Sequence, residues 1–396
     1  MIAKNKDEVQ YWTPDRIKKL GCDYNIIISG RSDGKTTAII GEIVKDYIER
    51  GSRGQYVRYL QEDFNSGRAV NLMRSLEYAG ENRDINLISE WTDGEYTTTK
   101  YQSRAWFLGR EVEDADGAIE TVFRKDPFCY ATALSQVGRD KSATPANVGI
   151  VHLDEFIPVR GVEPVGIVDD FVNMLSTTVR ASPNVTVYLT ANTVSWNSAF
   201  FEHFGIENDV VDMKLGEIRV FEAIDGDESS TLAVERGAPA RRKSGKGKPS
   251  DKFFLWGSGA TSRMVTDGAF AVPEYPRCPH HFTTANVKFT YWLEEPGKAV
   301  LRVRLLKVDR DLFVFVDRVP PEVKERLERP RDLHYSLEFT GARNHYVDVT
   351  RVYSHPATAY LADALRSNRV FFADDKTGTD FVYFVDRGAQ RSVLRP

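Results

Sequence analysis

The sequence predicts an α/β protein in which a mostly parallel sheet flanked by helices is followed by a smaller, strand-rich α+β domain. Two observations favour this class. In the first half of the chain, short apolar runs alternate with helical patterns, which is typical of a parallel sheet covered on both faces. In the second half, from about residue 285, successive apolar runs have the length of strands. A chain of 396 residues is long enough for two or three domains.

The elements of the first half follow from the spacing of apolar residues. Ile39, Ile40, Ile43, Val44 and Tyr47 recur at helical intervals, and short β-rich runs separate such patterns. The expected helices are Asp15–Leu20, Thr36–Arg50, Phe64–Tyr78 and Val165–Val179, and the expected strands are Tyr24–Ile28, Gln55–Leu60, Cys129–Leu134, Val148–Leu153 and Val185–Thr190.

The chain changes character at about Gly205, where it becomes polar and irregular. We expect a linker over residues 205–284 that contains a flexible basic loop, Arg236–Lys248, with six basic and no acidic residues. The expected domains are therefore 1–204 and 285–396, on either side of this linker. In the second domain the pattern predicts a helix at Tyr360–Leu365 and strands at Val287–Leu293, Ala299–Val308, Leu312–Val316 and Phe381–Val385.

A phosphate-binding loop is the sharpest motif in the sequence. Residues 29–36 have the Walker A form, with Gly34-Lys35-Thr36 at its end and Ser29 where the first glycine usually stands. Gly34 permits the tight turn, Lys35 supplies a cation for the β- and γ-phosphates, and the hydroxyl of Thr36 is a ligand for Mg²⁺. The residues expected to contact ATP are Ser29, Gly30, Arg31, Ser32, Asp33, Gly34, Lys35, Thr36 and Thr37.

An acid inside an anion-binding loop is unexpected. The Asp33 side chain has two possible arrangements: it faces outward, or it pairs with Arg31.

A pair of carboxylates ends the predicted strand Val148–Leu153. Asp154 and Glu155 have the Walker B form, in which Asp154 holds Mg²⁺ and Glu155 polarises the attacking water. A glutamate directly after the aspartate is typical of the additional-strand, catalytic-glutamate (ASCE) branch of P-loop ATPases.

Two further residues have alternative interpretations. Asn192 follows the strand Val185–Thr190, where it acts either as a γ-phosphate sensor or as a turn cap. Arg180 follows the apolar stretch Phe171–Val179; it either reaches the phosphate of a neighbouring subunit or complements a helix dipole.

Composition limits the compartment and the class of partner. Three widely spaced cysteines do not indicate a disulfide framework, and no apolar run approaches the length of a membrane span, so we expect a cytosolic chain. A net charge of −4 excludes a chain that is basic throughout, but an open ring can combine a basic lumen with an acidic rim.

Together these residues resemble the genome-packaging ATPases of phi-29-like short-tailed phages. Order and spacing agree over about residues 24–204. The matching segments are Asn25–Thr36, Gln55–Arg58, Lys141-Ser142, Asn147–Ile157, Thr178–Arg180 and Asn192–Ser195. Tyr59 and Gln61 depart from the pattern, because that family has further basic residues there.

The resemblance implies an ATPase that packages double-stranded DNA into a preformed capsid. It implies a homomeric ring of five subunits docked on the portal (connector) of the procapsid in the host cytoplasm, and it leaves open whether a packaging RNA joins the ring. Arg180 and Lys141 would act in trans on a neighbour's nucleotide. The C-terminal domain would be a vestigial nuclease of RNase H-like fold, and Asp309, Asp311 and Asp317 there are explained as hairpin-turn residues.

DNA contacts are expected to be to phosphates, since a packaging motor accepts any sequence. The candidates are Arg236, Arg241, Arg242, Lys243, Lys246 and Lys248, unless they form a solvated loop without a ligand. Three alternative functions remain at this stage: a large-terminase-type motor with nuclease activity, a P-loop nucleotide kinase, and a DNA-binding scaffold with an inactive phosphate loop.

Overall fold

The computed structural model of the chain divides into two compact units, Met1–Ala271 and Val272–Pro396. The structure describes residues 9–79, 84–113, 117–137, 145–158, 163–164, 166–254, 260–270, 273–295, 300–338 and 342–393. Lys141, one of the predicted site residues, lies outside the described residues.

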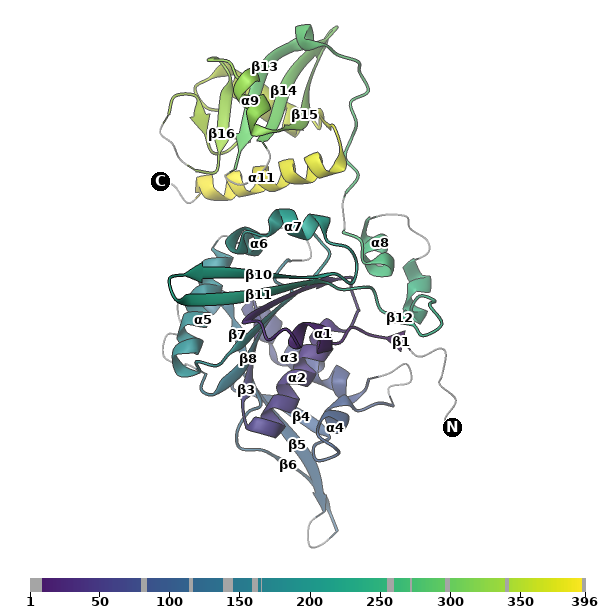
Figure 1. Cartoon of the computed structure of the whole chain (residues 1–396). Helices are drawn as coiled ribbons and strands as arrows, with labels where there is room; N and C mark the ends of the chain where they lie inside the picture. The colour runs from purple at the N-terminus through teal and green to yellow at the C-terminus, as the bar shows by residue number, and fades with distance from the viewer. Residues whose placement is uncertain are drawn as a thin grey trace. The chain divides into compact units, whose positions relative to one another are not determined.

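Parallel strands form the centre of the first unit (Figure 1). In spatial order they are β11 (Glu228–Arg236), β2 (Tyr24–Ser29), β9 (Thr186–Asn192), β8 (Val148–Asp154), β3 (Arg53–Arg58) and β7 (Cys129–Ala133). Because parallel strands end at the same edge of a sheet, Ser29, Asp154 and Asn192 all lie at its carboxyl edge. The predicted mostly parallel sheet is therefore confirmed.

Antiparallel strands extend this sheet on both sides. β10 (Ile218–Asp225) pairs with β11 on one side. On the other side β5 (Ala105–Glu113) pairs with β7, β4 (Thr98–Gln102) and β6 (Ile119–Phe123).

The β10–β11 hairpin corrects the predicted linker at 205–284. Residues 205–271 belong to the first unit, because β11 pairs with β2 along Leu232–Arg236. Most of β10 is exposed, so its sequence lacks the apolar run that marks a buried strand. It nevertheless forms a regular strand at the edge of the sheet.

Helices cover both faces of the sheet, as the pattern predicted. Along β2, Ile27 packs into one core cluster, whereas Ile26 and Ile28 pack into the other. The helices on the Ile27 face are α2 (Lys35–Arg50), α3 (Ser66–Glu77) and α4 (Leu87–Trp91). Those on the opposite face are α5 (Ile167–Ala181), α6 (Ala199–Phe204) and α7 (Glu207–Asp212).

Short elements complete the first unit. β1 (Val9–Gln10) pairs antiparallel with β12 (Arg241–Arg242), and Figure 1 shows them side by side. The remaining short helices are α1 (Asp15–Lys18), α8 (Ala260–Asp267) and the 3-10 turns η1 (Gln61–Phe64), η2 (Leu134–Gln136) and η3 (Pro249–Phe254).

The second unit is built on a mixed sheet. β13 (Val287–Glu294), β14 (Val300–Val308) and β15 (Asp311–Val319) form an antiparallel meander. β16 (Leu333–Ser336) and β17 (His345–Tyr346) continue it in parallel beside β13, and β18 (Val370–Phe372) lies parallel to β15. The helices are η4 (Thr284–Asn286), α9 (Pro321–Leu327), α10 (Pro356–Arg366) and α11 (Asp375–Val393). This is the predicted strand-rich α+β domain.

The predicted strand Phe381–Val385 is wrong, because these residues lie within α11. Phe381 and Phe384, three positions apart, are buried in the core, whereas Val382 is 40% exposed. A run of five apolar residues fits a strand equally well, and only the pattern of burial reveals the helical period.

Candidate nucleotide site

The phosphate loop connects β2 to α2 at the carboxyl edge of the sheet. The loop needs left-handed backbone at two positions, Ser32 with φ 62° and Gly34 with φ 92°. Gly34 suits this conformation, and a Cβ there would lie only 3.0 Å from Cβ of Tyr11. α2 begins directly at Lys35, with Thr36 and Thr37 in its first turn. Its amino-terminal end therefore lies at the loop, where backbone N–H groups favour an anion.

Lys35 is buried at the base of the loop. Its ammonium donates to the Ser29 hydroxyl and the Gly30 carbonyl, each at 2.9 Å. Burial lowers the pKa of Lys35 to about 8, against the opposing effect of Asp33 and Asp154. The buried Lys35 ammonium is not fully hydrated, so its electrostatic attraction to a phosphate would be stronger than in water.

Thr36 and Asp154 come together from separate strand ends. The Thr36 hydroxyl lies 3.1 Å from both carboxylate oxygens of Asp154. Asp154 also accepts hydrogen bonds from the hydroxyls of Tyr56, at 2.6 Å, and Thr190, at 2.7 Å. Burial acts to raise the pKa of the Asp154 carboxyl, but the Arg58 charge and these hydrogen bonds hold it below its usual value. Asp154 is therefore an ionised, oriented carboxylate that could hold a metal ion.

Glu155 is held in an unusual backbone conformation beside Arg58. Its φ is 54°, in the left-handed region, and residues strained in this way cluster at functional sites. The Arg58 guanidinium donates to Glu155 Oε2 at 2.6 Å and to Asp154 Oδ2 at 3.2 Å. The Gln55–Arg58 segment carries part of the family resemblance, yet nothing in the sequence indicates a role for Arg58, which the structure joins to both acidic residues.

Asn192 completes the cluster from the end of β9. Its side-chain carbonyl oxygen accepts from the Lys35 ammonium at 3.3 Å. The predicted sensor, phosphate lysine, hydroxyl ligand and carboxylate pair thus lie together at one edge of the sheet.

No protein-family model and no curated protein matches the chain. Among solved structures, the chain is similar to the Phi-28 gp11 DNA packaging motor, with 16% identity, a TM-score of 0.50, and coverage of 95% of this chain and 97% of that one. It is also similar to the bacteriophage Phi-29 viral genome packaging motor assembly, with 15% identity, a TM-score of 0.52, and coverage of 96% and 99%. This chain has the fold of the phage packaging motors. The resemblance and the fold class predicted from the sequence are therefore confirmed.

Arg180 lies away from the nucleotide cluster of its own subunit. It is exposed near the end of α5, where it donates to the Ser176 carbonyl. α5 leads into the start of β9, and Asn192 lies at the other end of that seven-residue strand, roughly 20 Å away at about 3.3 Å per residue. Arg180 therefore has no contact with the phosphate loop in cis.

Two of the six predicted DNA contacts have partners within the fold. Arg236 is half-buried, donates to the Met213 carbonyl and lies over the Phe270 ring. Lys248 is 5% exposed and pairs with Asp33, at 3.1 Å between Nζ and Oδ1. Both basic side chains therefore have partners within the first unit, and that of Lys248 is buried. Asp33 accordingly pairs with Lys248 and neither faces outward nor pairs with Arg31.

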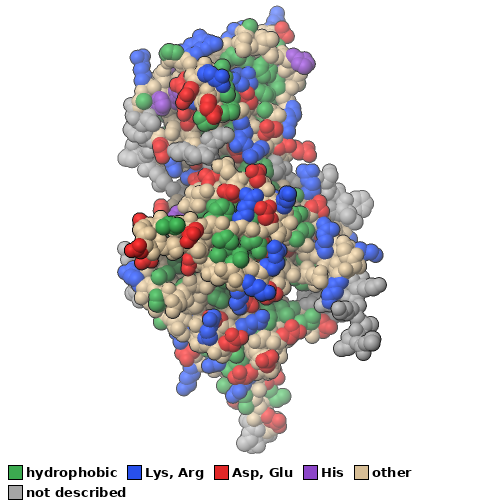
Figure 2. Space-filling model, in the orientation of Figure 1, with side chains coloured by type: hydrophobic (Ala, Val, Ile, Leu, Met, Phe, Trp, Pro, Cys, Tyr) green, Lys and Arg blue, Asp and Glu red, His purple; other side chains and the backbone are tan. Residues whose placement is uncertain are grey.

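The other four basic candidates remain near the surface. Arg241, Lys243 and Lys246 are exposed, and Arg242 is half-buried. They lie on or beside β12, and Figure 2 shows Lys and Arg side chains over this part of the first unit. Within this segment Arg241 and Arg242 pair with Gln10 and Val9 of β1, so the segment is not irregular throughout.

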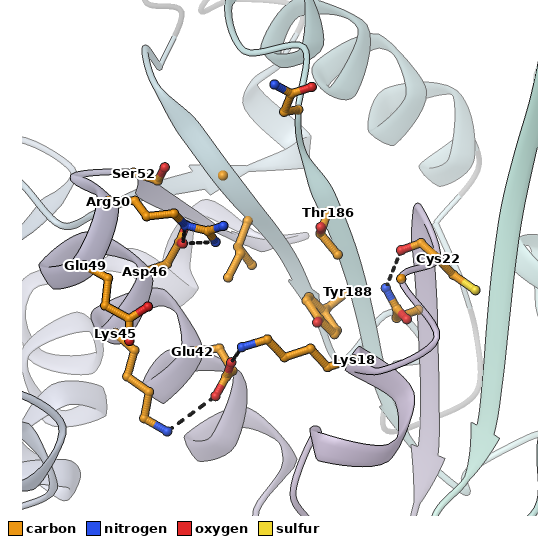
Figure 3. Close-up of a pocket in the computed structure, with 15 residues that line it drawn as sticks. Lys18, Cys22, Glu42, Lys45, Asp46, Glu49, Arg50, Ser52, Thr186 and Tyr188 are labelled. Carbon is orange, nitrogen blue, oxygen red and sulfur yellow. Dashed lines mark hydrogen bonds and ion pairs between the residues drawn. The ribbon is translucent and has the colours of Figure 1, made fainter.

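A cavity of about 500 Å³ lies at the opposite, amino edge of the sheet (Figure 3). Five of its charged residues pair with one another: Lys18 and Lys45 with Glu42, and Arg50 with Asp46. None of the phosphate-loop residues lines it. The cavity is therefore separate from the nucleotide site.

Of the three acids expected at hairpin turns in the second unit, Asp309 and Asp311 do stand at the turn between β14 and β15. The expectation is wrong for Asp317, which lies within β15 and pairs with Arg302 and Arg304 on the neighbouring strand β14. Within the described part of the chain, no three His, Cys, Asp or Glu side chains form a metal-ligand group. The helices described are all too short or too polar to cross a bilayer.

Proposed function

We propose that this chain is an ATP-driven translocase that packages double-stranded viral DNA into a preformed capsid. The observation that carries the proposal is the convergence of Lys35, Thr36, Asp154, Glu155 and Asn192 at one sheet edge. The packaging-motor fold supports it independently.

The residues present fit a nucleoside triphosphate with Mg²⁺. A hydroxyl and an ionised carboxylate, from Thr36 and Asp154, are the hard oxygen ligands that Mg²⁺ prefers, with phosphate oxygens and water completing its shell. Mg²⁺ bound there would neutralise charge on the phosphates during hydrolysis. Residues 29–37 would hold the triphosphate, with Lys35 as the buried cation.

Each remaining residue of the cluster has one task. Glu155 would orient the attacking water through its carboxylate, one oxygen of which, Oε2, accepts a hydrogen bond from Arg58 in the structure. Arg58 therefore restrains the catalytic carboxylate in the resting site. Asn192 contacts Lys35 and would report the presence of the terminal phosphate to β9.

The proposed motor is a homomeric ring, with five subunits expected, docked on the portal of the procapsid in the host cytoplasm. Arg180, exposed and remote from its own site, would serve a neighbouring subunit as an arginine finger. Such a residue contributes about 10³–10⁵ in rate in related chemistry. Lys141 would also act in trans. Arg241, Lys243 and Lys246 would contact DNA phosphates without reading bases.

Mixed rings test the proposal. Arg180→Ala and Glu155→Ala subunits should each lack DNA-stimulated phosphate release, and mixing them should restore part of it, because intact sites then form across subunit boundaries. A mixture of Lys35→Ala and Glu155→Ala is the matched control, since both lesions lie within one subunit's own site and cannot complement. Absence of recovery in the first mixture, or equal recovery in both, would contradict trans action.

A second measurement separates a motor from a kinase. Double-stranded DNA of unrelated sequences should stimulate ATP hydrolysis by the wild-type chain, with a strong dependence on salt. Hydrolysis that ignores DNA and needs a small phosphate acceptor would contradict the translocase.

A further inference from the structure

A carboxylate is buried inside the phosphate loop. The Asp33 side chain is fully buried. Its Oδ1 accepts from the Ala240 backbone N–H at 3.0 Å, while its Oδ2 is buried and without a hydrogen-bond partner among the described residues. An anion here opposes the binding of a triphosphate unless a cation compensates it, because charges interact strongly away from water.

The compensating cation comes from a distant part of the chain. Lys248, whose side chain is 3% exposed, places its ammonium 3.1 Å from Asp33 Oδ1 and 3.1 Å from the Arg31 carbonyl. Lys248 therefore neutralises the acid and also holds the loop backbone. Removing one partner of a buried ion pair leaves an uncompensated charge, which is costly.

The segment that carries Lys248 passes beside the phosphate loop, and we name residues 237–248 the strap. It begins where the Gly237 N–H donates to Ile28 at the end of β2. A Cβ on Gly237 would lie 2.9 Å from Cβ of Ser29, so the strap passes in close contact. It then reaches Asp33 twice, through Ala240 and Lys248.

The tip of the strap faces solvent with basic residues. A tight turn closes it, with hydrogen bonds from Arg242 N–H to Lys246 O at 2.9 Å and from Gly245 N–H to Arg242 O at 2.7 Å. Lys246 is exposed, and Lys248 is buried only two residues later. A displacement of the exposed tip at Lys246 would therefore also move Lys248, which contacts the phosphate loop.

We propose that Lys248 is a positioning residue of the nucleotide site, which compensates Asp33 and links the phosphate loop to the DNA-facing tip of the strap. The link to DNA rests on the proposed function. With the pair intact the loop accepts a triphosphate. When DNA displaces the tip, Lys248 withdraws from Asp33. The uncompensated charge of the Asp33 carboxylate then repels the phosphates, and the affinity for nucleotide falls.

A set of charge-balanced variants tests the first half of the proposal. Lys248→Met should raise the Kd of a fluorescent ATP analogue with Mg²⁺ at least tenfold, because Asp33 is left uncompensated. Asp33→Asn combined with Lys248→Met should restore the Kd to within about threefold of wild type, since neither charge remains. Lys252→Met, which removes an exposed lysine four residues further along the chain, is the matched control and should leave this Kd unchanged.

Thermal unfolding without nucleotide shows which variants are folded, so that a loss of nucleotide binding is attributed to positioning only in a folded variant. If Lys248→Met fails to fold, the double variant and Lys248→Arg still report on charge compensation, and both should bind the analogue. A Kd that is unaffected in folded Lys248→Met, or a double variant that binds as poorly as the single one, would overturn the inference.

The effect of bound DNA on nucleotide affinity tests the second half of the proposal, the link between the strap and DNA. The ratio of nucleotide Kd with and without double-stranded DNA should be at least fivefold in wild type and close to one in the double variant, because coupling between two sites needs a physical link. A ratio that is unchanged in the double variant would overturn the link. If wild type binds no nucleotide or no DNA, the proposed function itself fails, an outcome distinct from failure of the strap.

Discussion

Raising the pH above about 8 should weaken triphosphate binding, because the phosphates need the charged form of Lys35. Burial lowers the pKa of Lys35 from 10.5 to about 8, which corresponds to roughly 3 kcal/mol of preference for the neutral amine. At pH 7 most molecules of the free protein would carry the charge, whereas at pH 9 roughly one in ten would. The Kd should therefore rise roughly tenfold between these two values.

The direction in which the free energy of unfolding changes with pH distinguishes weaker triphosphate binding from loss of the fold. Lys35 has a lower pKa in the folded than in the unfolded chain, so between pH 8 and 10.5 the unfolded state binds more protons. The contribution of Lys35 to the free energy of unfolding therefore increases with pH in this range. Loss of binding at pH 9 should accordingly not be accompanied by a loss of stability from this group.

Titration of a fluorescent ATP analogue from pH 6.5 to 9.5, at constant ionic strength, measures the effect. Lys35→Arg is the control, since a guanidinium stays charged throughout and should give a flat profile even if its affinity is lower. A wild-type Kd that is constant from pH 7 to 9, or a Lys35→Arg profile with the same slope, would refute the reasoning.

Two further perturbations follow from the packing around the site. Arg58→Ala should release Glu155 and raise basal phosphate release, which lowers the ratio of DNA-stimulated to basal release about fivefold, since a partly exposed ion pair is worth about 1 kcal/mol. An unchanged ratio would contradict the restraint. Gly54→Ala should lower the free energy of unfolding by about 1–3 kcal/mol in a urea titration, because its Cβ would collide with Ile43 Cγ2. Gly67→Ala, which meets nothing closer than 3.8 Å, is its control, and equal losses would count against the collision.

The centre of the first unit was predictable because its signals are local. β2, α2 and β8 each combine an apolar run with a motif at one end, so each was placed within about two residues of its observed bounds. Strands exposed on the sheet margins carry no such signal. In β10 most positions are exposed, and in β6 the first four of five are, so neither has the apolar run that marks a buried strand.

Long-range partners explain what the sequence could not show at the site. Arg58 is 96 residues from Asp154, and no spacing rule connects them. The register of the sheet does: β3 and β8 pair Tyr56 with His152 and Val57 with Leu153, so the next position brings Arg58 beside Asp154. Knowledge that these two strands are neighbours would have been enough to predict the contact.

Lys248 shows a second reason why the site could not be predicted fully from the sequence. An acid within a phosphate loop implies a nearby cation, because an isolated buried carboxylate would be too costly. The sequence offered Arg31 as the local partner, yet Arg31 is exposed, and the partner comes from 215 residues away. Charge balance can therefore predict from sequence that a partner exists. Only the path of the strap, fixed by β11 beside β2 and by β12 beside β1, determines which of six basic residues it is.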